Sequence, residues 1–98
     1  MALLHVDLQE GFESEPVTVS VNGQDIFRKP AVRTRTQIGL ADSFELTLPP
    51  GDTTVQVSAR GATAQFTVSL QDTVYVGISI TPEGEIVHRT SPKAFGYL

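Results

Sequence analysis

The chain has 98 residues, a length typical of one folded domain, and 40% of them are hydrophobic while 18% are charged. Eleven Asp and Glu residues outnumber seven Lys and Arg residues, and the formal net charge of −4 argues against a surface that is electropositive throughout, as a nucleic-acid platform would be. The absence of cysteine excludes disulfides, thiolate metal sites, iron–sulfur clusters and a cysteine nucleophile.

The N-terminal apolar run is interrupted by His5 and Asp7 before it reaches the roughly 7–15 residues of a signal-peptide core. No stretch approaches the roughly 20 apolar residues of a membrane-spanning helix. We therefore expect a soluble protein located in the cytoplasm, without a membrane partner.

Alternation of apolar and polar residues begins clearly at Val17, Val19 and Val21, which is typical of a half-buried strand. The dipeptide Asn22-Gly23 favours a tight hairpin turn into a second strand over residues 24–29. Proline cannot donate to a sheet ladder, so Pro30 is expected to end this strand or to lie on an edge. The alternation resumes over residues 32–38, where Val32, Thr34, Thr36 and Ile38 share a face and the arginines face water.

The middle of the chain predicts three further strands. Phe44, Leu46 and Leu48 form an inward face before a turn at residues 49–52. Residues 55–59 and 64–70 form a hairpin across Gly61-Ala62, because glycine at the first turn position suits type II′ geometry.

The run Val74, Val76, Ile78 and Ile80 is the best candidate for a central strand, and a turn over residues 81–85 leads into a last short strand. We therefore predict an all-β fold with one domain over residues 1–98 and an apolar C-terminal tail over residues 90–98. Its architecture is expected to be a two-layer antiparallel β-sandwich of about eight strands, immunoglobulin-like or prealbumin-like, with a barrel as the alternative.

The sequence provides little for catalysis, and we assign no catalytic residue, no metal ligand and no cofactor. The imidazoles are His5 and His88, and no serine has the glycine pattern of a nucleophile elbow. Clustering of Asp72 with the turn acids Glu83 and Glu85 is a weak metal hypothesis, and solvated acids are the ordinary interpretation. Phosphate-binding loops before a helix are absent from the pattern.

Candidate interaction residues fall in three places. Arg33 and Arg35 share one face of their predicted strand, which is a weak anion-binding signal, and Tyr75 is one of few rings available for a sugar. The tail residues Phe95, Tyr97 and Leu98 would expose apolar area unless their own chain or a partner covers them.

Two motifs indicate a family. Residues 19–24 read Val-Ser-Val-Asn-Gly-Gln, and residues 44–57 combine an apolar strand, a Pro-Gly turn and a second strand. From Val17 to Leu70 the chain thereby resembles the small β-sandwich modules of the PEGA type and the carboxypeptidase regulatory-like (prealbumin-like) group. Gly61-Ala62 replaces the Gly-Tyr pair that commonly closes a PEGA unit. The resemblance implies a non-enzymatic accessory or binding role and no particular functional residue.

These observations predict a non-catalytic protein that acts by protein–protein contact or as an accessory component. The partner is expected to be protein, either another chain or a second copy in a homodimer, bound at a strand edge or through the tail. Nucleic acid is disfavoured by the net charge. The alternatives are a glycan- or polyanion-binding module using Tyr75 or the arginine face and, as the weakest, a small hydrolase using His88.

Overall fold

The computed structural model describes residues 1–35 and 37–96, which form strands and their connections. None of these residues provides a helix that could span a membrane. The strands are β1 (Ala2–Leu8), β2 (Glu13–Val21), β3 (Gln24–Arg33), β4 (Asp42–Leu48), β5 (Gly51–Ala59), β6 (Ala62–Leu70), β7 (Thr73–Ile80) and β8 (Ile86–Ser91).

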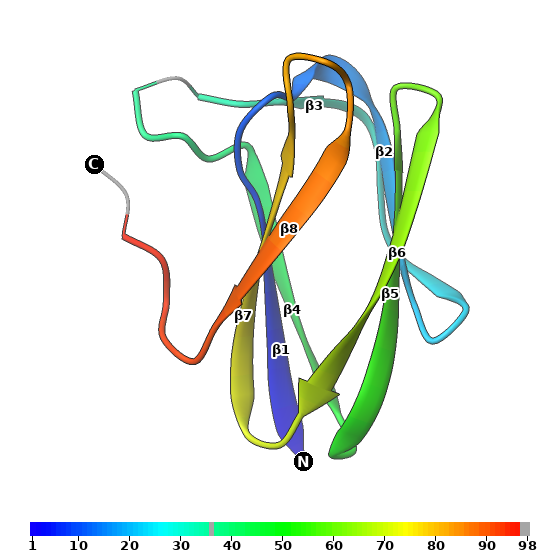
Figure 1. The fold of residues 1–98 in the computed structure, drawn as a ribbon, viewed down its shortest axis with the longest axis vertical. Helices are drawn as coiled ribbons and strands as arrows, with labels where there is room; N and C mark the ends of the chain where they lie inside the picture. The colour runs from blue at the N-terminus through cyan, green and yellow to red at the C-terminus, as the bar shows by residue number, and fades with distance from the viewer. Residues whose placement is uncertain (36, 97–98) are drawn as a thin grey trace.

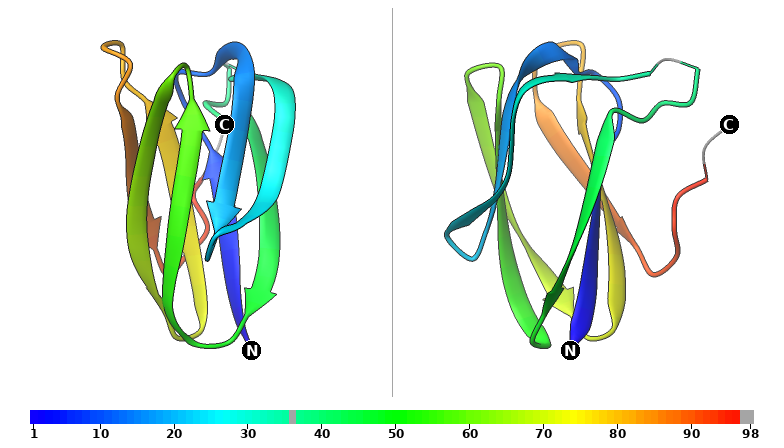
Figure 2. Two further views of the ribbon diagram at one scale, coloured as in Figure 1. Left: turned by 90° about the vertical axis from the view of Figure 1, so that its right-hand side faces the viewer. Right: turned by 180° about the vertical axis from the view of Figure 1, so that it is seen from behind.

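The strands form two four-stranded sheets that face each other (Figures 1 and 2). Sheet A has the order β4-β1-β7-β8, and sheet B has the order β3-β2-β5-β6. The predicted β-sandwich is confirmed, and the barrel alternative is wrong. Neighbouring strands run antiparallel as predicted, with the exception of β1 and β7, which pair in parallel.

Alternate residues of the strands face the layer between the sheets and form one shared core. The period of two sends every second side chain of a strand to the same face, so the apolar positions found in the sequence meet across the layer. The largest fully buried side chains of the described residues are Leu4, Leu8, Leu70, Ile78, Val6, Val17, Val19, Val55, Val57, Val76 and Thr53.

Two hairpin turns in sheet B have positive φ at both central residues, as type I′ turns require. Asn22 (51°) and Gly23 (82°) connect β2 to β3, as predicted. Between β5 and β6 the turn consists of Arg60 (53°) and Gly61 (74°), and Ala62 already belongs to β6. The predicted hairpin is present, but its turn is placed one residue too late, because Gly61 takes the second position of a type I′ turn.

The predicted strand over residues 32–38 is wrong beyond Arg33, where β3 ends. The N–H of Arg35 donates to the carbonyl of Leu40 at 3.0 Å, so the chain turns back on itself instead of extending. Thr36, which the alternation placed on the inward face, lies outside the described residues. This connection projects from the sandwich on the same side as the C-terminal tail (Figure 2).

The chain crosses from sheet A to sheet B at Gly11, between β1 and β2. Before the crossing, the N–H of Gln9 donates to the carbonyl of Ile78 at 2.7 Å, and the N–H of Ile80 donates to the carbonyl of Glu10 at 2.8 Å. Gly11 has a φ of 90°, and a Cβ there would lie 1.9 Å from the carbonyl oxygen of Ile80. Glycine is therefore required both for the backbone conformation and for the close approach to β7.

We predict that Gly11→Ala lowers the free energy of unfolding by about 3 kcal/mol or more, because left-handed strain and a backbone clash add together. Gly23 also has a positive φ, 82°, but an added Cβ would meet no atom within 4 Å. Gly23→Ala is the matched control, with an expected loss of about 1 kcal/mol. Urea denaturation of both variants tests this, and equal losses would contradict the proposed clash.

Candidate functional site

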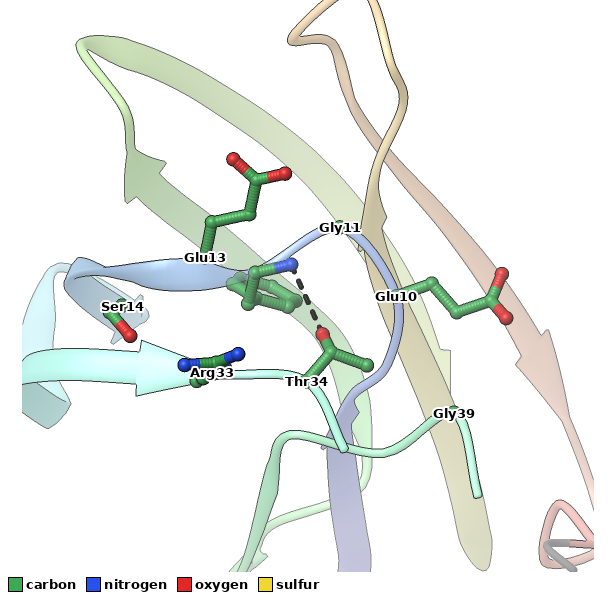
Figure 3. A pocket seen from close by; sticks show the side chains of 8 residues that line it. Glu10, Gly11, Glu13, Ser14, Arg33, Thr34 and Gly39 are labelled. Carbon is green, nitrogen blue, oxygen red and sulfur yellow. Dashed lines mark hydrogen bonds between the residues drawn. The ribbon is translucent and has the colours of Figure 1, made fainter. Parts of the chain in front are cut away.

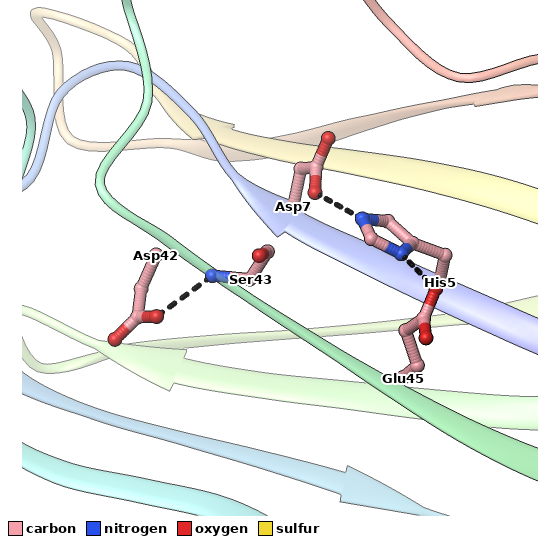
Figure 4. A network of polar contacts seen from close by, with 5 residues as sticks. All are labelled: His5, Asp7, Asp42, Ser43 and Glu45. Carbon is pink, nitrogen blue, oxygen red and sulfur yellow. Dashed lines mark hydrogen bonds and ion pairs between the residues drawn. The ribbon is translucent and has the colours of Figure 1, made fainter.

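One imidazole and two carboxylates meet on the outer face of sheet A (Figure 4). Nδ1 of His5 lies 2.7 Å from Oε2 of Glu45, and Nε2 lies 2.7 Å from Oδ1 of Asp7. The antiparallel register of β1 and β4 places Glu45 beside His5, and the two-residue period of β1 places Asp7 on the same face. Asp7 is only 4% exposed, so a carboxylate is buried within this group.

Both ring nitrogens of His5 face carboxylate oxygens, which accept hydrogen bonds, so the arrangement suits an imidazolium that donates from each nitrogen. Burial lowers the pKa of His5, but the hydrogen bonds to Glu45 and Asp7 and the charges of both groups outweigh it. The pKa is therefore raised above its ordinary value of 6.5. In this geometry neither nitrogen is available to accept a proton from a substrate.

No role for His5 was predicted from the sequence, although part of the signal was present. Residues two apart on a strand share a face, so His5 and Asp7 could have been paired from the alternation alone. Glu45 could not, because its place beside His5 depends on which strand pairs with β1.

Tyr75 lies on β7 in the same row of the outer face as His5, and the two ring centroids are 5.2 Å apart. Its side chain is half-buried, in keeping with a ring that packs against its neighbour. A sugar platform would instead present the face of the ring to solvent.

The tail folds back toward its own chain as far as the structure describes it. The ring centroid of Phe95 lies 4.4 Å from the guanidinium of Arg89 on β8, and Nε of Arg89 donates to Oε1 of Gln9 at 3.3 Å. Of the predicted tail residues, Phe95 thus has a partner within the chain, whereas Tyr97 and Leu98 lie outside the described residues.

The predicted arginine face is separate from Tyr75 and Phe95. Arg33 lines an open pocket of about 610 Å³ at the crossing between the sheets, together with Glu10 and Glu13 (Figure 3). Arg33 and Arg35 also line a second, smaller hollow. Both arginines are exposed, as predicted, but acidic side chains share the larger pocket and reduce its attraction for a polyanion.

The remaining candidates do not converge on a site. The ring of His88 stacks on Phe66 of β6, with centroids 3.7 Å apart and planes 5° apart. Asp72 precedes β7 whereas Glu83 and Glu85 follow it, so the acids lie at opposite ends of the sandwich (Figure 1). The hypothesis that these three acids cluster is wrong, and no metal-binding group of three or more His, Asp or Glu side chains occurs among residues 1–35 and 37–96.

A different surface lies at the outer edge of sheet B, where β6 is the last strand. The carbonyl of Thr54 on β5 accepts from the N–H of Asn22, and the N–H of Thr54 donates to the Asn22 side chain, so both backbone groups of Thr54 point away from β6. The N–H and C=O groups of successive residues in an antiparallel strand point alternately to one side and to the other. Thr54 pairs with Thr67, so the backbone groups of Thr67 point away from β5. The residues of β6 whose N–H and C=O point outward are therefore Thr63, Gln65, Thr67 and Ser69, and we call this row the free edge.

Comparisons of the chain with models of protein families, with curated proteins and with solved structures found no match. The two surfaces that stand out are the His5 group on sheet A and the free edge on sheet B.

The raised pKa of His5 predicts a stability that depends on pH. A group with a raised folded pKa contributes fully below its unfolded pKa and loses its contribution as pH rises through the folded value. From about pH 5 to about pH 9 we expect the free energy of unfolding to fall, because the contribution of the protonated ring is lost as pH rises through its raised pKa. Urea denaturation across this range measures the free energy of unfolding at each pH, and NMR titration of the His5 ring measures its pKa.

His5→Gln should remove this part of the pH dependence, and His88→Gln, which removes the other imidazole, should retain it. A His5 titration midpoint below 6.5 would contradict the proposed imidazolium.

Proposed function

We propose that this chain is a non-catalytic β-sandwich protein that acts by protein–protein contact, and that the contact is made by adding a partner strand to the free edge of β6. The observation that supports this is the composition of β6. Its nine residues, Ala62–Leu70, contain no charge, proline or glycine, and they pair with β5 without a register shift. An edge strand of this kind offers a row of unpaired backbone groups to another strand.

The other edge of sheet B is protected by the devices that β6 lacks. Strand β3 contains Arg28, Lys29 and Pro30, and its pairing with β2 has three register shifts. Pro30 does not end this strand, but β3 is an edge strand of sheet B, which confirms the other alternative predicted for this proline. Charge, proline and bulges all discourage strand addition, so the contrast within one sheet favours β6 as the contact edge.

The edges of sheet A are also less suited to strand addition. Strand β4 contains Asp42 and Glu45, and β8 has only six residues, includes Arg89, and ends just before Pro92. The sandwich is moreover closed on the β3/β4 side by an ion pair between Lys29 and Asp42 at 2.5 Å.

The geometry of the imidazoles supports a role without catalysis. A general base needs a ring nitrogen that can accept a proton, and both nitrogens of His5 are engaged by carboxylates. His88 lies flat on Phe66, where the ring packs as an aromatic surface. The accessory role implied by the resemblance to PEGA-type and carboxypeptidase regulatory-like modules agrees with this proposal, and a cytoplasmic location stays a prediction.

A proline at position 65 tests the free edge directly. Gln65→Pro removes an outward N–H and places a ring where a partner strand would approach, while the bonds from β6 to β5 are left in place. In affinity capture from native lysate, we expect proteins retained by the wild-type chain to be lost with this variant.

The matched control is Arg28→Pro. Because Thr18 pairs with Ser58 on one side and with Arg28 on the other, the same alternation turns the backbone of Arg28 outward at the opposite edge of sheet B. Arg28→Pro should therefore retain the captured proteins. Equal capture by both variants, with folding verified by circular dichroism, would refute contact through β6.

A further inference from the structure

We propose that the strand added to the free edge is β6 of a second copy of this chain, in an antiparallel pair with Phe66 of both copies on the two-fold axis. This inference rests on the proposed function and identifies its partner. The pairing would join two copies of sheet B into one continuous sheet of eight strands.

The backbone pattern of β6 is self-complementary in this register. An antiparallel pair centred on residue 66 places Gln65 opposite Thr67 of the second copy and Thr63 opposite Ser69 of the second copy. All four are outward residues, so each opposed pair can exchange two backbone hydrogen bonds. A shift of either copy by one residue would oppose outward with inward residues and lose these bonds.

The charges at the two ends of β6 favour the antiparallel direction. Arg60 precedes the strand, Asp72 follows it, and each is six residues from Phe66. Antiparallel pairing therefore brings Arg60 of each copy toward Asp72 of the other, whereas parallel pairing would bring like charges together. Between these ends the strand is uncharged, so two chains with a net charge of −4 can meet there without opposing acids.

The side chain on the proposed axis is an aromatic ring that the chain leaves partly exposed. Phe66 is half-buried, and the exposed His88 of β8 stacks on it at 3.7 Å. Residues on the axis form a pair without hydrogen bonds, in which side chains of antiparallel strands come closest. Pairing of two copies would thus cover both Phe66–His88 stacks with apolar contact, which a strand lacking an aromatic residue at this position would not do.

Sedimentation of the purified chain over a micromolar concentration series tests the second copy as partner. We expect a dimer for the wild type and at least about tenfold weaker dimerisation for Gln65→Pro, since the two-fold axis removes the N–H of residue 65 twice. Gln65→Lys should also weaken the dimer, because the two lysines lie diagonal to each other across the axis.

Gln56→Lys is the control for the added charge. Gln56 is the β5 partner of Gln65 and is exposed on the same face, one strand further from the axis. This variant should dimerise like the wild type. Equal weakening by Gln56→Lys and Gln65→Lys would show an effect of net charge and refute the proposed interface.

Exchange of the end charges tests the direction of pairing. Arg60→Asp and Asp72→Arg should each weaken the dimer, and the double variant should recover most of the loss. Arg60 also lies 4.0 Å from Glu13, so Glu13→Gln is measured in parallel to isolate the contribution of the intramolecular pair. Additive losses in the double variant would refute the antiparallel arrangement.

The absence of cysteine from the chain allows the register to be tested by single thiols. Across a hydrogen-bonded pair the Cα atoms are about 5.5 Å apart, within disulfide range, whereas the diagonal separation is about 7–8 Å. A mixture of Gln65→Cys and Thr67→Cys chains should therefore form the mixed disulfide faster than either chain alone. Faster formation of either homodimeric disulfide would overturn this register.

The failure of this inference can be told from the failure of the proposed function. A wild-type chain that stays monomeric throughout the series, while Gln65→Pro still abolishes capture of other proteins, would refute the second copy as partner and leave strand addition intact. A monomeric chain whose captured proteins are unaffected by Gln65→Pro would refute both.

Discussion

Strand β1 lies in the middle of sheet A and connects the other strands of that sheet. This strand pairs with β4 on one side and with β7 on the other, so without it β4 would be separated from β7 and β8. Its inward residues Leu4, Val6 and Leu8 are fully buried and reach the core that both sheets share. Its outward residues, His5 and Asp7, build the charged group on the opposite face. Burial of the first set therefore determines where the second set lies.

The parallel pairing of β1 with β7 also determines the path of the chain. Antiparallel neighbours can be joined by a two-residue turn, but parallel neighbours need a long connection, and here that connection includes all of sheet B. The tight crossing at Gly11 begins this path. A glycine in the first connection thus affects the whole topology, because after leaving β1 the chain passes the end of β7 too closely for any side chain.

A two-layer sandwich leaves the outer strands of each sheet with unpaired backbone groups, and this chain treats them unequally. Strand β3 has charge, a proline and bulges, whereas β6 has nine uncharged residues in uninterrupted register. Protection of an edge reduces strand addition, so an edge without protection is informative when another edge of the same sheet has it. The Phe66–His88 stack lies beside this edge, and backbone groups and apolar surface are therefore available at one place.

The polar group on sheet A differs from the free edge of β6, because its side chains are already paired with one another. Both ring nitrogens of His5 lie 2.7 Å from carboxylate oxygens, and one of these oxygens belongs to the buried Asp7. A buried carboxyl group is costly without a partner, and the contact with His5 supplies Asp7 with one. The contact of His5 with Glu45 links the side chains of β1 and β4 on this face.

Elements that depend on neighbouring residues could be predicted from the sequence alone. Alternation of apolar side chains predicted β2, β4, β5, β6 and β7 with the buried face of each, and Asn22-Gly23 predicted a turn, because both signals act over a few residues. Type I′ and type II′ turns differ little in free energy, and the hydrogen bond from Arg35 to Leu40 is not visible in the alternation. For these reasons the sequence pattern placed the β5–β6 turn one residue late and extended a strand beyond Arg33. It named Tyr75 and Phe95, which lie on the outer side of sheet A, but not Glu45 beside His5 or the free edge of β6. Those features depend on which strands become neighbours, and only the burial of both sheets against each other decides that order.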